Sequence, residues 1–171
     1  MAAEASKRAF WVKAAAALIV VTGLFGVLPN FYTFGIQGNT STHSLKGSLF
    51  ITDRTKGLDD LLAGDYVAFE TDHRQAPFFK PGRVFAKRVV AVHGDVVTWE
   101  DDALLVNGEK VTDIKPSQLK KWLEAGHSQL SEERVLDREV VAIGDHPDSL
   151  DSRFFGALSS SDIVGEVFLL W

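Results

Sequence analysis

Cysteine is absent from this chain of 171 residues. Its absence excludes thiol catalysis, disulfide bonds and cysteine-rich zinc sites. Positive charge is scarce as well, because 18 lysines and arginines stand against 23 aspartates and glutamates, which gives a net charge of −5. There is no run of basic residues, and this composition argues against a nucleic-acid-binding protein. Internal repeats and low-complexity tracts are missing too, and the length fits one domain plus a short appendage.

The five histidines do not form a metal-binding pattern. They are scattered along the chain without a spacing such as His-x-x-x-His. We therefore expect surface or turn positions for them, with neither a metal site nor a Ser-His-Asp triad, and we expect no cofactor. These histidines are His43, His73, His93, His127 and His146.

One long apolar stretch lies near the N-terminus. Between Phe10 and Leu28 the only charged residue is Lys13. At about 1.5 Å per helical residue, the stretch nearly spans a hydrocarbon core of about 30 Å. We predict a transmembrane anchor over residues 10–28. A cleavable signal peptide is the rival interpretation, but the residues that follow are too bulky for a small-x-small cleavage site.

Positive charge flanks only the N-terminal side of this stretch, whereas residues 29–43 carry no formal charge. By the positive-inside rule, residues 1–9 stay in the cytoplasm and residues 29–171 form an extracytoplasmic domain. Aromatic residues just after the stretch suit an interfacial belt: Phe31, Tyr32 and Phe34.

Beyond the anchor, short runs of β-branched and aromatic residues alternate with turn signals. This pattern predicts a mainly β, mostly antiparallel domain. Residues 116–126 form the one convincing helix, with Pro116 in its first turn and Gly126 at its end. Residues 129–138 are polar, and we expect them to be exposed. The predicted strands are residues 48–52, 65–71, 95–99, 103–106, 109–111, 139–143 and 162–171, together with the stretch 85–95, which ends in a Gly-Asp turn.

A lysine stands among apolar residues in the stretch 85–95. Alternation along a strand puts Phe85, Lys87, Val89 and Ala91 on one face. The other face is equally apolar apart from Arg88, which indicates a strand covered on both sides. Burial disfavours the charged form of a lysine and lowers its pKa, so Lys87 is a candidate amine base. The alternative is a lysine that extends to the sheet edge and stays solvated.

Three segments of the domain carry motifs: Thr42-His43-Ser44-Leu45, Lys87-Arg88-Val89 with Gly94-Asp95, and Gly-Asp-His-Pro-Asp-Ser-Leu-Asp-Ser-Arg-Phe-Phe-Gly over residues 144–156. These motifs resemble those of the type I signal peptidases, serine peptidases with a Ser-Lys dyad, and most closely the conjugative-transfer (TraF-type) branch. The sequence departs from that branch at three positions. His146 replaces an asparagine, and Lys46 and His93 replace prolines.

The resemblance implies a role for each of four residues. Ser44 is the expected nucleophile and Lys87 the general base that accepts its proton. Thr42 is expected to add a hydroxyl to the oxyanion hole beside the Ser44 backbone N–H. Ser149 is expected to orient the lysine amine. Ser41 and Ser48 are the competing nucleophile candidates.

Three further charged residues of these motifs have two interpretations. We expect Asp151 and Arg153 to form a structural ion pair, with Arg88 as another possible partner of Asp151. The resemblance also associates an aspartate of this motif with the joining of pilin ends, so Asp151 is a candidate for a role in cyclisation.

The resemblance implies a signal-peptidase-like β domain and a membrane-anchored serine endopeptidase of the bacterial inner membrane. Its expected partners are the membrane and an exported precursor, most plausibly a conjugative pilin, and not nucleic acid. Two alternatives remain open. One is a general signal peptidase that serves many secreted proteins, and the other is a catalytically silent pilus-assembly factor.

Overall fold

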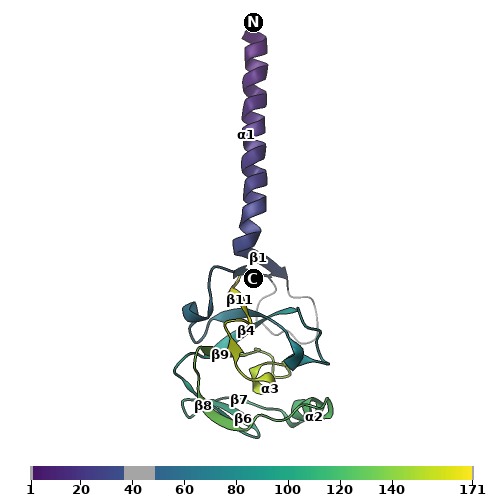
Figure 1. Cartoon of the computed structure of the whole chain (residues 1–171), viewed down its shortest axis with the longest axis vertical. Coiled ribbons are helices and arrows are strands. Elements are labelled where there is room, and N and C mark those ends of the chain that lie inside the picture. The colour runs from purple at the N-terminus through teal and green to yellow at the C-terminus, as the bar shows by residue number, and fades with distance from the viewer. Residues whose placement is uncertain (1, 37–48, 171) are drawn as a thin grey trace.

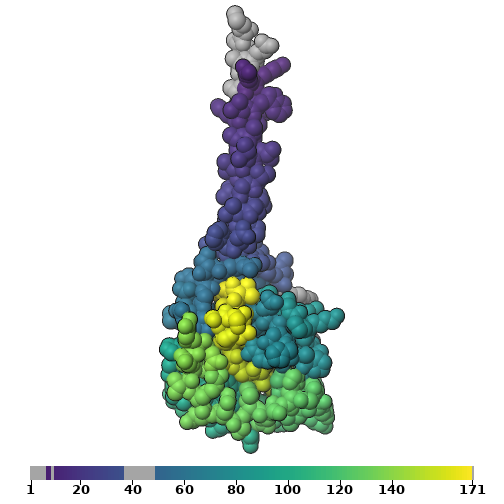
Figure 2. All heavy atoms as spheres, in the orientation of Figure 1, coloured from purple at the N-terminus to yellow at the C-terminus, as the bar shows by residue number. Residues whose placement is uncertain are grey.

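The structure is a computed structural model that describes residues 2–36 and 49–170. Helix α1 (Ala2–Phe31) projects away from a β domain that the later residues form (Figures 1 and 2). Its apolar part, Phe10–Phe31, comprises 22 residues with a mean hydropathy of 2.0 and is not buried in the protein. By length and composition the helix is able to cross a membrane, and its apolar part continues past Leu28.

The larger sheet has seven antiparallel strands in the order β1-β2-β11-β3-β4-β9-β10. Because the late strand β11 inserts between β2 and β3, the C-terminal strand ends beside the base of α1, while the N-terminus lies at the far end of that helix (Figure 1). The strands are β1 (Tyr32–Ile36), β2 (Leu49–Asp53), β3 (Tyr66–Glu70), β4 (Val84–Ala91), β9 (Glu139–Ile143), β10 (Leu158–Ser159) and β11 (Ile163–Leu169).

The smaller sheet has four antiparallel strands in the order β7-β6-β5-β8. Its β6–β7 hairpin turns at Asn107 and Gly108, both with positive φ, as an Asn-Gly pair favours. The strands are β5 (Val96–Trp99), β6 (Ala103–Val106), β7 (Glu109–Asp113) and β8 (Glu132–Val135). The sequence-based prediction of a mainly β, antiparallel domain is therefore confirmed.

Three strands lie where the sequence did not predict them: β1, β8 and the two-residue strand β10, which pairs with β9. Strand β1 follows α1 directly and pairs with β2, so Tyr32 and Phe34 belong to the sheet. Strand β8 has the polar sequence Glu-Glu-Arg-Val and pairs with β5 at the edge of the smaller sheet. The Thr98 hydroxyl donates a hydrogen bond to Glu133 across this pair. Cross-strand polar contacts of this kind stabilise an edge strand that has no apolar face.

The helices of the domain are short. Helix α2 (Pro116–Glu124) confirms the prediction of a helix, with Trp122 buried and Gly126, at φ 90°, just past its end. Helix α3 (Ser152–Phe155) was not predicted. It begins because the Asp151 side chain accepts a hydrogen bond from the Arg153 backbone N–H. Two 3₁₀ turns, η1 (Leu58–Asp60) and η2 (His73–Gln75), complete the domain.

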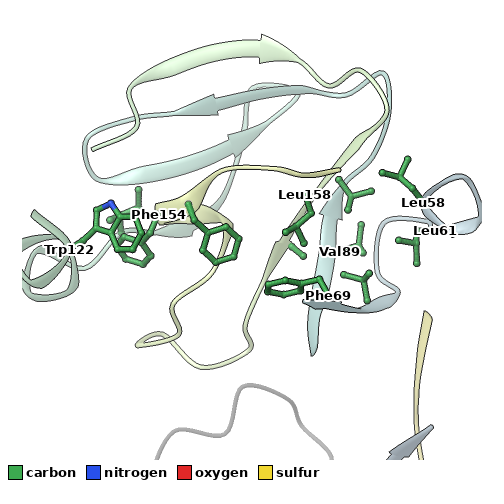
Figure 3. Close-up of a cluster of buried hydrophobic side chains, with 12 residues drawn as sticks. Leu58, Leu61, Phe69, Val89, Trp122, Phe154 and Leu158 are labelled. Atoms are coloured by element: carbon green, nitrogen blue, oxygen red, sulfur yellow. The ribbon is translucent and has the colours of Figure 1, made fainter. Parts of the chain in front are cut away.

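Strand β4 contributes to all three hydrophobic clusters of the core. Val89 packs in the cluster drawn in Figure 3, with Phe69, Phe154 and Leu158. Ala91 packs in a second cluster, around Trp99, and Ala86 in a third. The prediction that Ala91 shares a face with Lys87 and Val89 is therefore wrong. The pairing of β4 with β9 shifts between Val89 and Ala91, and such a bulge moves the following side chain to the other face.

Candidate active site

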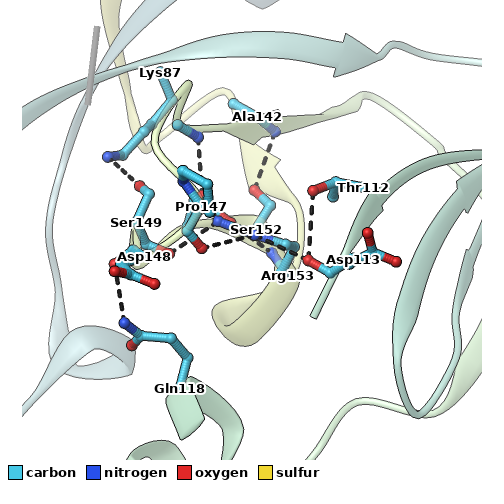
Figure 4. Close-up of polar contacts among 12 residues, drawn as sticks. Lys87, Thr112, Asp113, Gln118, Ala142, Pro147, Asp148, Ser149, Ser152 and Arg153 are labelled. Atoms are coloured by element: carbon cyan, nitrogen blue, oxygen red, sulfur yellow. Dashed lines mark hydrogen bonds and ion pairs between the residues drawn. The ribbon is translucent and has the colours of Figure 1, made fainter. Parts of the chain in front are cut away.

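Lys87 lies in the middle of the larger sheet. Strand β4 pairs with β3 on one side, where Val67 faces Lys87, and with β9 on the other. The side chain is only 3% exposed, and its Nζ donates a 2.7 Å hydrogen bond to the Ser149 hydroxyl (Figure 4). Lys87 is therefore buried in the sheet and does not reach solvent at its edge.

Burial changes the acid–base behaviour of this amine. Loss of hydration, opposed in part by Asp151 and Asp145 and assisted by Arg153, lowers the pKa of Lys87 from 10.5 to about 8. With a pKa near 8, about one-tenth of the amines are neutral at pH 7, against about 0.03% for an ordinary lysine. The side chain can thus accept a proton near neutral pH.

Ser149 is held in place by its own loop, residues 144–151. Its backbone N–H donates to the His146 carbonyl at 3.0 Å, and its carbonyl accepts from the Arg153 guanidinium at 3.1 Å. The absence of a side chain at Gly144 makes room for it. A Cβ built there would overlap the Ser149 hydroxyl and lie 3.2 Å from the Lys87 Nζ. Gly144 therefore permits the contact between Ser149 and Lys87.

Asp151 and Arg153 form a buried ion pair behind this loop. The Arg153 Nε lies 2.8 Å from one Asp151 oxygen, and a terminal guanidinium nitrogen lies 2.8 Å from the other. The second oxygen also accepts from the Gly144 backbone N–H at 2.9 Å. Asp151 is completely buried and Arg153 is 3% exposed. The pair therefore links both ends of the loop that carries Ser149.

Arg88 pairs with a residue that the sequence did not suggest. Its Nε lies 3.2 Å from Asp145, whose other oxygen accepts a 2.8 Å hydrogen bond from the Tyr66 hydroxyl. The expected alternative, a pair between Arg88 and Asp151, does not form, because Arg88 pairs with Asp145 and Asp151 pairs with Arg153. Burial and the hydrogen bond to Asp145 raise the pKa of Tyr66 to about 12.

The predicted nucleophile and its support lie outside the described residues. These are Ser44 and Thr42, and the rival serines Ser41 and Ser48, the departure at Lys46 and the histidine His43 lie there too. The described chain resumes at β2, which lies in the same sheet as Lys87. Lys87, Ser149, Asp151 and Arg153 are brought together by the structure, whereas Arg88 is not part of this group.

A cavity of about 270 Å³ opens beside Lys87. Two contacts to Asp148 hold helix α2 at the rim of this cavity. Gln118 donates a 3.3 Å hydrogen bond to the Asp148 carbonyl (Figure 4), and Lys115, just before the helix, forms an ion pair with the Asp148 carboxylate at 2.7 Å. This link could not be predicted from the sequence, because Lys115 and Gln118 lie 33 and 30 residues before Asp148. The lining residues are Phe78, Phe79, Phe85, Lys87, Gln118, Lys121, Trp122, Asp148, Ser149 and Leu150.

The histidines of the described chain serve local structure. His127 stacks on Trp122, with ring centroids 3.7 Å apart, and His146 accepts a hydrogen bond from the Asp148 backbone N–H at 3.1 Å. His93 accepts one from the Arg138 backbone N–H at 3.1 Å, while His73 is exposed. Within residues 2–36 and 49–170, no three histidine or acidic side chains are grouped as ligands of a metal ion.

An apolar helix of membrane-spanning length, an antiparallel β domain and a buried lysine hydrogen-bonded to a serine are the features expected of a membrane-anchored Ser-Lys peptidase. The family model described as "Signal peptidase, peptidase S26" matches residues 8–171. The chain therefore belongs to the signal peptidase S26 family.

Individual members of the family are distant relatives. Signal peptidase I of Bacillus licheniformis is 26% identical over 150 residues, covering 84% of this chain and 76% of the relative. Signal peptidase I V of Bacillus subtilis (strain 168) is 27% identical over 159 residues, covering 80% of this chain and 95% of the relative. A solved signal peptidase I from Enterococcus faecalis V583 aligns at 21% identity with a TM-score of 0.38, covering 62% of this chain and 95% of that structure.

The lowered pKa of Lys87 predicts a pH dependence for cleavage. Only the neutral amine accepts a proton, so kcat/KM is expected to rise about tenfold per pH unit and to level off above a midpoint near 8. The measurement is kcat/KM for a precursor peptide between pH 5.5 and 10.5. A midpoint at the ordinary lysine value, or a flat profile, contradicts the assignment of Lys87 as the base.

Gly144→Ala is expected to inactivate the enzyme without unfolding it. The added methyl group overlaps the Ser149 hydroxyl, so Ser149 must turn away and release the Lys87 amine. We expect a loss of activity of about 10²-fold, as for other misplaced catalytic groups. Gly57→Ala is the matched control, since nothing lies within 4 Å of a Cβ at that position. Equal activity of the two variants contradicts the role of Gly144.

Proposed function

We propose that this chain is a membrane-anchored serine endopeptidase that cuts exported precursors at the membrane surface. The observation that carries the proposal is the buried Lys87 amine, fixed by Ser149 and with its pKa lowered to about 8. Buried amines of this kind are what a serine peptidase needs when no histidine serves as base. Membership of the signal peptidase family supports the same activity.

The proposed reaction uses Ser44 and Lys87 as a dyad. Lys87 Nζ accepts the hydroxyl proton as Ser44 Oγ bonds to the scissile carbonyl carbon. Thr42 and the Ser44 backbone N–H donate to the resulting oxyanion. The carbon–nitrogen bond then breaks, and the ammonium of Lys87 returns the proton to the departing amine. Water attacks the acyl-enzyme by the same route, giving a free carboxylate and the regenerated serine.

Precursor processing tests this proposal most simply. The full chain is incubated in detergent with a candidate precursor, and the products are weighed by mass spectrometry. The wild type is expected to release a leader peptide and a mature protein, and Ser44→Ala to release neither. Ser41→Ala and Ser48→Ala are matched controls that should cleave normally. If one of these two controls is inactive and Ser44→Ala is active, the nucleophile is assigned wrongly.

The substrate class has two candidates. The motifs at Lys87 and at residues 144–156 favour a conjugative pilin precursor, whereas the curated relatives carry the name of general signal peptidases. Incubation with a pilin precursor and with a set of secreted-protein precursors separates the two. Cleavage of the pilin precursor alone supports the specialised enzyme. Cleavage of the whole set at similar rates supports the general one.

Orientation in the membrane is part of the proposal. Lys7, Arg8 and Lys13 flank only one side of the apolar helix, so the N-terminus is expected in the cytoplasm and the β domain outside it. A cytoplasmic reporter fused after Trp171 should therefore stay inactive, while an export-dependent reporter at the same position should be active. The reverse result contradicts the orientation and the substrate class with it.

Asp151 is better suited to holding the loop than to joining pilin ends. Joining requires a carboxylate that can bind the incoming ammonium, but Asp151 is completely buried and both of its oxygens are occupied. We therefore propose that Asp151 positions Ser149 through Arg153 and Gly144. Asp151→Asn should lower cleavage and thermal stability together. A stable variant that cleaves normally but no longer yields a circular product would contradict this assignment.

A further inference from the structure

An apolar groove lies where α1 meets the β domain. Its volume is about 810 Å³, within the range of ligand-binding pockets. Three residues of the last turns of α1 form one wall, and residues of β1, β2 and β11 form the other. The groove is lined by Phe25, Leu28, Pro29, Tyr32, Thr33, Phe34, Ile51, Arg54 and Phe168.

The groove is continuous with the membrane-spanning helix. Phe25 and Leu28 belong to the apolar stretch Phe10–Phe31, and they are 77% and 48% exposed. The facing sheet residues Phe34 and Phe168 are 71% and 44% exposed. Figure 1 shows β1 and the end of β11 beside the base of α1. With the helix anchored in the membrane as proposed above, this wall extends its lipid-facing surface and is placed next to hydrocarbon chains.

One cation stands at the edge of this apolar surface. The backbone N–H of Arg54 donates a 2.7 Å hydrogen bond to the carbonyl of Phe31, the last residue of α1. Arg54 is therefore fixed at the level where the helix leaves the hydrocarbon, and its side chain is exposed. One oxygen of the neighbouring Asp53 carboxylate accepts hydrogen bonds from the Thr55 backbone N–H and hydroxyl, at 2.9 and 2.7 Å.

We propose that this groove binds a membrane phospholipid, with an acyl chain against its apolar walls and the phosphate on the Arg54 guanidinium. The proposal rests on the membrane anchoring proposed above. An arginine matches a phosphate geometrically through paired N–H donors, and the apolar walls match the chain. Such a lipid would fill the space between helix and sheet and hold the β domain against the bilayer.

Native mass spectrometry of the full chain in detergent tests the site. The chain is mixed with equal amounts of phosphatidylglycerol and of diacylglycerol with the same acyl chains. We expect the wild type to retain the phosphate-bearing lipid, and Arg54→Gln to retain it about fivefold less, the effect of one cation at a membrane surface. Glycerol phosphate, which lacks the chains, should not be retained.

Arg138→Gln is the matched control, because Arg138 is exposed and lies between β8 and β9, outside the groove. It should retain lipid like the wild type. Equal retention by Arg54→Gln and Arg138→Gln overturns the proposal, and so does retention of glycerol phosphate alone. If an added leader peptide is retained in place of the lipid, the groove is a substrate site and the lipid assignment is wrong.

A separate measurement distinguishes failure of the lipid site from failure of the anchor. The full chain is expressed in bacteria, and its membranes are washed at alkaline pH. Retention in the membrane pellet supports the proposed membrane anchor. A negative result in the lipid-binding experiment then overturns only the proposal that the groove binds a phospholipid. Release of the protein into the supernatant overturns both the proposed membrane anchor and the proposed phospholipid site.

Discussion

Lys87→Arg is expected to lower kcat/KM for precursor cleavage by about 10⁴-fold or more. The guanidinium stays protonated at every accessible pH and cannot accept the serine proton. Its size also conflicts with the closely packed slot beside Ser149 and Gly144. The measurement is the rate of precursor cleavage at pH 8. Lys120→Arg, the same change at an exposed position on α2, is the control and should be fully active.

Lys87→Met separates loss of chemistry from loss of fold. Below a pH of about 8 the folded protein carries a buried ammonium whose hydration is lost, and this lowers stability relative to an ordinary lysine. The methionine variant should therefore be inactive and at least as resistant to denaturant as the wild type at pH 7. If either Lys87 variant cleaves at the wild-type rate, a buried neutral amine is not the base.

Arg153→Met is expected to lower the free energy of unfolding by about 3–5 kcal/mol. The substitution leaves the Asp151 carboxylate completely buried without its counter-ion, and it removes the hydrogen bond that holds the Ser149 carbonyl. Activity should fall in the same variant. Denaturant unfolding of the full chain in detergent measures the change.

An exposed ion pair provides the control for this prediction. Lys115 and Asp148 lie 2.7 Å apart, but their side chains are 44% and 39% exposed. Lys115→Met should therefore cost about 1 kcal/mol or less. Similar decreases in the free energy of unfolding of Arg153→Met and Lys115→Met would contradict the prediction that the buried pair contributes more to stability than the exposed one.

Local patterns in the sequence were sufficient for most of the sheet. Alternating runs and the Asn107-Gly108 turn predicted eight of the eleven strands that the structure describes, all except β1, β8 and β10, and Pro116 and Gly126 marked the limits of helix α2. The edge strand β8 was missed because its residues are polar. Hydrogen bonds to β5, and not burial of apolar side chains, hold this strand in the sheet. The bulge in β4 could not be predicted either, because the rule that side chains alternate between the two faces assumes regular pairing along the whole strand.

The candidate site was only partly readable from the sequence. Apolar neighbours alone left open whether Lys87 is buried or solvated, and the resemblance of the motifs to the type I signal peptidases implied a buried lysine with Ser149 beside it. Contacts between distant segments gave no local signal. The pairing of Arg88 with Asp145 and the link from α2 to Asp148 depend on how the sheets and the helix pack together.

The central claim is that Lys87 is a buried amine that can lose its proton near neutral pH. Carbon-13 NMR of the lysine Cε in the labelled full chain measures this directly, with Lys87→Met identifying the signal. The account predicts a titration midpoint near 8, well below the ordinary value of 10.5. A midpoint close to 10.5 would contradict it.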